Sequence, residues 1–519
     1  MYLPKLAEVS NKAKKSIIEF MGLDKRAAIA DNALSACTNL SSRNFPLISP
    51  RLPRTASYTL TSGKALFAAT KLAWVDSVTF TSPAGDITFG AHTITSATSK
   101  FGGIAVGDTL VITGCTVNTD NNATVVVTTA SAATITCSAT TFTITSGDPA
   151  GKETAAITFT GCSFKYDNVT KGVVTASAKC MVELLGRIVI FPDNVSYDTV
   201  GGTFASFGTG TYPTAGSVPD IDYACVLDNR IWAVEGDDVY CTALGDFDDW
   251  TTFSSPSEAT DAYQVDTGTN GNFTGIVSYK GAVLAFKRDR VFKVFGTIPS
   301  DFQLIEISRL GCLDSKSICE VNDILFWLSP QGVVAYTGGS PEVISECLNE
   351  SYTTGKGGGD GRWYYASLYN GTAYALYTYD TWKKIFLKED TLQVTEFAFL
   401  DGYLYALASD NKIYKLGYGS ETISSSLTTK EFSEYISNKK GHSELFCRVD
   451  LETGATMAVY VRTDNGAFTK VKDYNATDLT SFKIALKLKN ADHFQIRLDM
   501  SGDYKVHQLQ RMFYVGEDD

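Results

Sequence analysis

The sequence predicts an all-β protein built around a β-propeller, and three observations carry this prediction. Between residues 176 and 419, short apolar strands recur in pairs, with no helical segment between them. A tight polar turn joins the strands of each pair, and these turns recur every 31 to 52 residues. Tyr and Phe together number 55 and Gly numbers 43, a balance that suits strands and tight turns. Strand pairs at this period are typical of propeller blades stacked around an axis. The turn dipeptides are Leu185-Gly186, Asp228-Asn229, Lys280-Gly281, Asn322-Asp323, Asn370-Gly371 and Asp401-Gly402.

Length and composition set the frame for the other elements. At 519 residues the chain is too long for one core, and we expect three or four domains. The hydrophobic content of 44% and the charged content of 20% indicate an ordered protein. Lysines interrupt the apolar residues at the N-terminus, so no secretion signal is expected, and no apolar run of membrane-spanning length occurs. The eleven cysteines contain no CxxC pair and are interpreted as buried hydrophobes in a protein assembled in a reducing cytoplasm.

The first domain, residues 1–56, is predicted to be an N-terminal helix followed by an extended arm. Leu6, Val9, Ala13, Ile17 and Phe20 share one face at helical spacing over residues 4–21, and Gly22 would end the helix. The helix would either pack on its own protein or dock onto a neighbouring subunit. Residues 39–54 contain three prolines within eight positions, which forbids a helix. We expect this arm to run across a surface rather than form part of a core.

The propeller is predicted to span residues 57–76 and 162–429. The first blade would be split, because residues 57–76 find their continuation only at 162–175. Residues 77–161 between them are rich in Thr and β-branched residues and predict an inserted small β-barrel or sandwich. Counting the split unit favours seven blades, and six remain possible if it is not a true blade. The other units are 176–218, 219–268, 269–310, 311–355, 356–390 and 391–420.

Residues 430–519 predict a C-terminal antiparallel β-sandwich. Five alternating segments are separated by turn signals at Thr453-Gly454, Asp464-Asn-Gly466 and Ser501-Gly-Asp503. The predicted strands are 445–451, 457–462, 481–488, 493–498 and 507–515.

No catalytic, cofactor-binding or metal-binding residues are predicted, and we expect a protein that is not an enzyme. The four histidines, His92, His442, His493 and His507, lack metal-ligand spacing. Residues 147–153 have the wrong spacing for a phosphate loop. Residues 266–271 resemble the start of a calcium loop, but Val277 stands where a bidentate Glu belongs.

Acidic pairs and aromatic residues offer weaker signals for glycan chemistry. A glycosidase needs two carboxylates that converge across a cleft, which sequence alone does not show. The pairs are Asp237-Asp238, Asp248-Asp249, Glu389-Asp390 and the terminal Glu517-Asp518-Asp519, and we interpret them as solvated loop charge. The segment Tyr379-Asp-Thr-Trp382 lacks the full frame of a sialidase Asp box. Trp232, Trp327 and Trp363 sit in strand positions that favour blade core over sugar stacking.

The net charge of the chain bears on whether it binds nucleic acid. The net charge is −12 and the pI is near 5.0, whereas a protein that grips phosphates needs a basic surface. An acidic wall would instead repel DNA and let it slide.

Several segments together resemble the propeller proteins of tailed-phage virions, including the tail-nozzle and packaged-DNA-stabilisation proteins of short-tailed phages. The resemblance covers the propeller and the C-terminal domain but not residues 77–161. Its residues are Asn39-Leu-Ser-Ser-Arg-Asn-Phe-Pro46, Pro50-Arg-Leu-Pro-Arg54, 227–233, 239–250, 279–294, 325–336 and 492–503.

The resemblance implies a structural tail component without catalytic residues. Such proteins form a ring, usually a hexamer, that continues the channel of the portal and adaptor rings, retains packaged DNA and lets it exit. Expected partners are further copies of the chain, the adaptor or portal-proximal ring and tail fibre or other tail proteins, and DNA would pass through the lumen without specific binding. The expected location is the virion tail, after assembly in the host cytoplasm. A tail hub or another tail ring protein is an alternative station, and a glycan-binding or glycan-cleaving propeller for host recognition is the alternative function.

Overall fold

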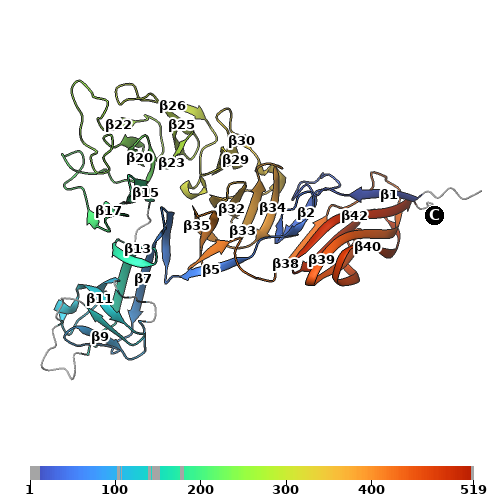
Figure 1. Cartoon of the computed structure of the whole chain (residues 1–519), viewed down its shortest axis with the longest axis horizontal. Helices are drawn as coiled ribbons and strands as arrows, with labels where there is room; N and C mark the ends of the chain where they lie inside the picture. The colour runs from blue at the N-terminus through green and yellow to red at the C-terminus, as the bar shows by residue number, and fades with distance from the viewer. Residues whose placement is uncertain are drawn as a thin grey trace, which may run out of the picture.

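The protein consists of a ring of sheets with a β-sandwich on one side and a small β-domain projecting from another (Figure 1). The structure is a computed structural model that describes residues 12–101, 104, 106, 108–137, 142, 152–175 and 180–515. Within these residues the only helices are three short 3-10 helices, η1 (Thr119–Asn121), η2 (Ser315–Ser317) and η3 (Ser345–Leu348). The all-β prediction is confirmed.

Six separate four-stranded antiparallel sheets form the blades. The first is β15 (Cys180–Leu184), β16 (Arg187–Phe191), β17 (Val195–Asp198) and β18 (Phe204–Ser206); the second is β19 (Tyr223–Leu227), β20 (Arg230–Glu235), β21 (Asp238–Cys241) and β22 (Tyr263–Asp266). The third is β23 (Phe273–Tyr279), β24 (Ala282–Lys287), β25 (Val291–Phe295) and β26 (Gln303–Ser308); the fourth is β27 (Cys319–Val321), β28 (Ile324–Ser329), β29 (Gly332–Tyr336) and β30 (Glu342–Val343). The fifth is β31 (Thr354–Gly359), β32 (Trp363–Tyr369), β33 (Tyr374–Asp380) and β34 (Ile385–Asp390); the sixth is β35 (Val394–Leu400), β36 (Tyr403–Ala408), β37 (Lys412–Leu416) and β5 (Arg54–Thr59).

The six predicted turn dipeptides all join adjacent strands of one blade. At five of them both residues adopt left-handed φ angles, between 47° and 78°, and at Asn370-Gly371 the glycine does. Two consecutive left-handed residues match the right-handed twist of the flanking strands. The dipeptides therefore predicted where the chain reverses within each blade.

The ring is closed by part of a larger sheet. Strands β6 (Gly63–Ala68), β7 (Leu72–Ser82), β13 (Ile157–Tyr166) and β14 (Val169–Val173) belong to a nine-stranded sheet. Leu66 and Trp74 pack against Leu407 of the sixth blade, whereas Val75 and Phe164 pack with residues of the first blade. The structure thus has six separate blades where the sequence favoured seven, because the first predicted unit continues into the insertion.

Strand β5 corrects one predicted boundary. Residues 57–59 were predicted to open the first unit, but β5 pairs with β37 of the sixth blade, with Thr59 opposite Lys412 and Arg54 opposite Leu416. A strand from the N-terminal part of the chain thereby completes the last blade of the propeller. A pairing between segments about 350 residues apart leaves no local signal.

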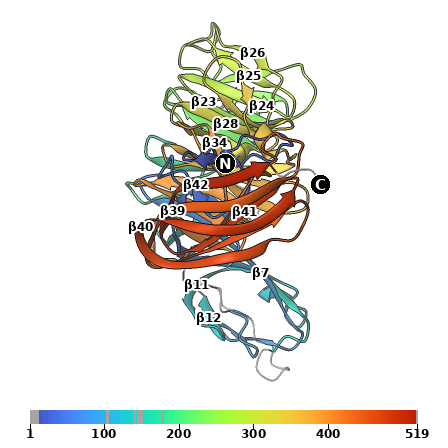
Figure 2. The same ribbon diagram turned by 90° about the vertical axis from the view of Figure 1, so that its right-hand side faces the viewer.

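The insertion extends the nine-stranded sheet away from the ring (Figures 1 and 2). Its buried residues, including Ile87, Ile112 and Phe159, form a hydrophobic cluster separate from the blade clusters. The strands that its Thr-rich and β-branched sequence predicts are present. The bounds are β8 (Ile87–Phe89), β9 (Thr93–Ser96), β10 (Thr109–Thr113), β11 (Thr124–Ala130) and β12 (Thr134–Cys137).

The C-terminal sandwich is built on two long strands. It comprises β38 (Ser424–Thr429), β39 (Lys440–Thr463), β40 (Thr469–Ala491), β41 (Phe494–Ser501), β42 (Tyr504–Val515) and the N-terminal strands β1 (Lys12–Ile17) and β2 (Leu34–Thr38). Two strands were predicted with a turn at Thr453-Gly454, but β39 runs through this point. Its partner changes there from β42 to β41, and Gly454 has a φ of +84°. The glycine therefore permits a bend rather than a reversal.

The predicted N-terminal helix is wrong where the structure describes it. Residues 12–17 form β1, an edge strand that pairs with β42, with Lys12 opposite Tyr514. Residues 4–11 of the prediction lie outside the described residues. Ile17 and Phe20 are buried in the sandwich, so their apolar character reflects sheet packing. Gly22 has a φ of +75°, and a Cβ there would lie 2.6 Å from the backbone oxygen of Phe386 in the fifth blade, so it allows a close approach between domains.

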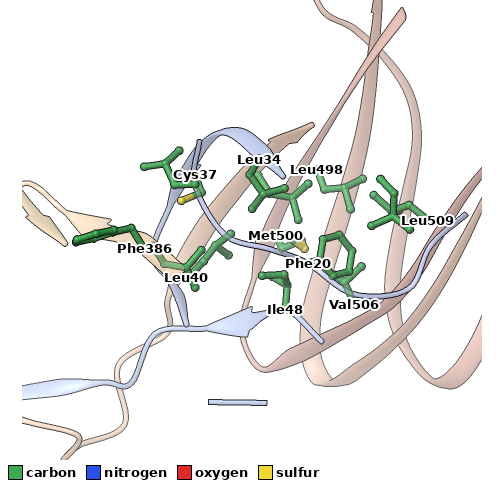
Figure 3. Close-up of a cluster of buried hydrophobic side chains, with 14 of the residues drawn as sticks. Phe20, Leu34, Cys37, Leu40, Ile48, Phe386, Leu498, Met500, Val506 and Leu509 are labelled. Carbon is green, nitrogen blue, oxygen red and sulfur yellow. The ribbon is translucent and has the colours of Figure 1, made fainter. Parts of the chain in front are cut away.

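The proline-rich arm is likewise not a surface segment. Leu40 and Ile48 are 0% and 1% exposed and belong to one hydrophobic cluster with Phe386 of the propeller and Leu498 and Val506 of the sandwich. Figure 3 shows the arm lying between these two domains. The short strands β3 (Leu40–Ser41) and β4 (Ser49–Pro50) pair with each other within it. The arm therefore fills the core that joins propeller and sandwich.

Candidate functional site

A cavity of about 690 Å³ lies at the centre of the propeller, lined by inner strands and loops of several blades. Its charged residues are Asp220, Asp222, Asp314, Lys316, Lys356 and Glu396. Lys316 Nζ lies 2.8 Å from Glu396 Oε2, which also accepts a hydrogen bond from the Leu66 backbone N–H. Lys356 pairs with Asp314, whose carboxylate also accepts from the Thr354 hydroxyl at 2.6 Å.

These pairings occupy two of the four carboxylates that line the central cavity. Lysine partners occupy Asp314 and Glu396, so neither resembles the free acid and base of a glycosidase. Within the described part of the chain, no group of three or more His, Cys, Asp or Glu side chains is placed to hold a metal ion. The ion pairs bridge different blades and therefore stabilise the ring around its axis.

The acidic charge of the chain is concentrated in the first two blades. Residues 180–269, which we call the acidic sector, contain fifteen Asp and Glu but only two Arg, a net charge of −13. The whole chain carries −12, so the remainder is almost neutral. Such an asymmetry gives one side of a propeller a strong negative potential.

Burial and the high density of acidic residues raise the pKa of individual carboxyl groups in this sector. Burial raises the pKa of Asp248 to about 6, and Asp246 beside it contributes. Burial and the nearby carboxylates of Asp220 and Asp222 raise the pKa of Glu235. Arg230 supports the acidic loop that follows β21, because its guanidinium donates to the carbonyls of Thr242 at 2.6 Å and of Asp261 and Ala259 at 2.5 Å.

Two of the acidic pairs serve local structure, but the interpretation of Glu389-Asp390 as solvated loop charge is wrong, because both residues lie in β34 and Glu389 is buried. Asp249 accepts from the backbone N–H groups of Thr251 and Thr252, each at 3.1 Å. Asp238 accepts from the Tyr240 hydroxyl at 3.2 Å. Asp390 pairs with Arg54 of β5 at 2.5 Å, and burial raises the pKa of neighbouring Glu389 to about 7. The structure brings none of these pairs to the central cavity, and Glu517-Asp518-Asp519 lies outside the described residues.

The histidines and loop motifs also have structural surroundings. His442 is buried and stacks on Phe494 with ring centroids 4.3 Å apart, while His493 contacts Asp492 at 3.2 Å. Burial lowers the pKa of His507. Asp266 accepts from the Gly268 backbone in a turn after the second blade. Residues 147–151 lie outside the described residues.

The segment around Trp382 forms a stack of rings and arginines. Asp380 accepts from the backbone N–H groups of Trp382 and Lys383, which fixes the turn, and it also pairs with Arg362. The Arg362 guanidinium lies 4.3 Å from the Trp382 ring and 4.5 Å from the Trp363 ring. Trp382 is 63% exposed. Trp232 and Trp327 are buried in blade clusters, which confirms their prediction as core.

Comparisons with known proteins leave the function open. No family model matches the chain, and no curated protein matches it. Among solved structures, a putative exported protein from Bacteroides fragilis aligns at 12% identity over 44% of this chain and 78% of its own, with a TM-score of 0.29. PorZ, a surface component of the type-IX secretion system of Porphyromonas gingivalis, aligns at 11% identity over 83% and 56%, with a TM-score of 0.29. An exo-β-1,3-galactanase from Phanerochaete chrysosporium aligns at 8% identity over 66% and 96%, with a TM-score of 0.27. Similarity this low carries no functional argument. In the described residues, no helix has the length and apolarity needed to cross a membrane.

Proposed function

We propose that the chain is a structural component of a phage tail, a nozzle subunit that forms a ring and continues the portal and adaptor channel. The acidic sector carries this proposal. Its net charge of −13 gives one side of the propeller a surface that repels phosphates. Placed toward the lumen, that surface lets DNA slide without binding, and the nearly neutral remainder faces other tail proteins.

The architecture of the molecule suits the wall of a channel. Strand β5 completes the sixth blade, the ion pairs Lys316–Glu396 and Lys356–Asp314 link different blades, and the arm joins propeller and sandwich in one core. Packing the blades around an axis leaves only short, protected strand edges. The proposed assembly is a hexamer in the virion tail, formed in the host cytoplasm, with an adaptor or portal-proximal ring and fibre or other tail proteins as partners. The proposed role requires no catalysis.

Electron microscopy tests the assignment. The purified full-length chain, imaged across a range of concentrations, should form rings with a central opening, and a C-terminal label should mark the tail of virions. In a gel mobility-shift assay at physiological salt, the protein should not retard duplex DNA. A chain that stays monomeric at every concentration, or that binds duplex DNA tightly, contradicts the proposal.

A further inference from the structure

The outer face of the sandwich carries a hollow of about 950 Å³. Three rows of side chains cross strands β38, β41, β39 and β40 at this face, because residues opposite one another in a sheet point to the same side. The rows are Ser424–Ser501–Thr456–Asn475, Ser426–Asp499–Ala458–Asp473 and Thr428–Arg497–Tyr460–Lys470. Ala458 lines the hollow, and its side chain is smaller than those of Asp499 and Asp473, which lie opposite it on either side.

Alternation along the strands fixes these side chains outward. Between them, Leu427, Met457, Val459, Leu498 and Met500 point inward and are at most 3% exposed. The outer rows are therefore held by a packed core rather than by flexible loops. Edge strand β2, which pairs with β38, adds Thr38, which lies opposite Ser426.

The chemistry of the lining is neutral and rich in hydroxyl groups. Asp499 is neutralised by Arg497 at 2.9 Å and also accepts from the Ser426 hydroxyl at 2.7 Å. Asp473 is paired with Lys470 at 2.7 Å. The Arg497 guanidinium in turn lies 4.3 Å from the Tyr460 ring. No excess of charge of either sign remains among these pairs.

We propose that this hollow is a binding site for neutral saccharides. A sugar presents alternating hydroxyl donors and acceptors around an apolar ring face. Fixed carboxylate, guanidinium, amide and hydroxyl groups would bind the hydroxyls, while Ala458 leaves room for the ring. Nucleic acid is a poor fit because the cations are already paired. A protein interface of this size would carry more exposed apolar and aromatic side chains at its centre.

An array of neutral and acidic oligosaccharides, probed with the full-length chain, tests the site. The best neutral ligand is then titrated by calorimetry. Ala458→Phe fills the hollow and should weaken binding at least tenfold. Ala205→Phe, at an exposed alanine of edge strand β18, is the matched control and should bind as the wild type does. Thermal unfolding of each variant checks the fold. If Ala458→Phe unfolds, Asn475→Ala at an exposed position replaces it, with an expected loss of at least threefold.

Absence of binding to any neutral oligosaccharide overturns the site, as does exclusive binding to acidic glycans. Undiminished binding by a folded Ala458→Phe also overturns it. If the wild type binds no sugar and Ala458→Phe disrupts a ring, the face is a subunit interface instead. The outcome is separate from the proposed tail role, because rings without sugar binding contradict only this inference.

Discussion

The sandwich and the insertion are both attached to the propeller, but only the sandwich shares its core. A single hydrophobic cluster runs from the fourth and fifth blades through the arm into the sandwich. The insertion has a cluster of its own and is connected through β7 and β13. Continuity of a core makes two domains fold and move together, whereas a connection by two strands lets each keep its own stability.

Truncation of the arm should have the largest effect. Leu40 is fully buried between propeller and sandwich, and Leu40→Ala should lower the free energy of unfolding by about 2–5 kcal/mol. Because the cavity opens in a shared core, propeller and sandwich should lose stability in the same transition. Calorimetry together with amide exchange resolved along the chain measures this. A loss confined to the sandwich would contradict the shared core.

The same junction should give the protein a specific pH dependence. Burial raises the pKa of Glu389 to about 7, above its ordinary value of 4.5, despite the nearby Arg51 and Arg54. The folded state then binds a proton that the unfolded state has released, so the contribution of Glu389 is full below pH 4.5 and is lost as the pH rises through 7. The loss amounts to roughly 3 kcal/mol. We expect Glu389→Gln to abolish this part of the pH dependence.

Denaturant titrations of both proteins between pH 5 and 8 measure the difference. Asp401→Asn serves as the control, because Asp401 lies in an exposed turn outside the junction. Parallel stability profiles for the wild type and Glu389→Gln would show that Glu389 is ionised at little cost.

The sequence could predict features that depend on local residues, but not features that depend on contacts between distant segments. Turn dipeptides such as Asp228-Asn229 and Asp401-Gly402 encode left-handed backbone locally, so the blades were predictable. The roles of Ile17 and Leu40 depend on contacts with segments hundreds of residues away. Ile17 fits a helical stripe and a buried strand equally well, and partner strand β42 decided the outcome.

The functional features also divide into those that the local sequence shows and those that arise only in the fold. The concentration of acids in residues 180–269 is a property of sequence and could have been counted. The pairing of Lys316 with Glu396 arises only when blades meet around the axis. The hollow at Ala458 requires the register of four strands, although the repeated Ser and Thr at alternate positions of residues 424–428 are a partial signal.

A cavity made in the insertion should destabilise a smaller part of the molecule than a cavity made in the arm. Ile112 is 1% exposed within the insertion's own cluster. Ile112→Ala should therefore destabilise that domain by about 2–5 kcal/mol while leaving exchange in the blades and the sandwich unchanged. Proteolysis should cut within residues 83–156 first. Equal acceleration of exchange in the blades would show that the insertion and the ring unfold as one unit.

Removal of the insertion should have the smallest effect on the remainder. Ser82 and Ile157 lie directly opposite each other in the pairing of β7 with β13. A two-residue Asn-Gly turn between them can therefore close the hairpin in place of residues 83–156. The shortened chain should keep the wild-type melting temperature of the propeller and sandwich within a few degrees and should still form rings if the insertion lies outside the ring contacts. A matched variant with Gly-Gly as the turn separates the effect of the deletion from that of the new turn. Loss of the main unfolding transition in both variants would mean that the insertion stabilises the closing sheet, and the contrast with the sandwich would not hold.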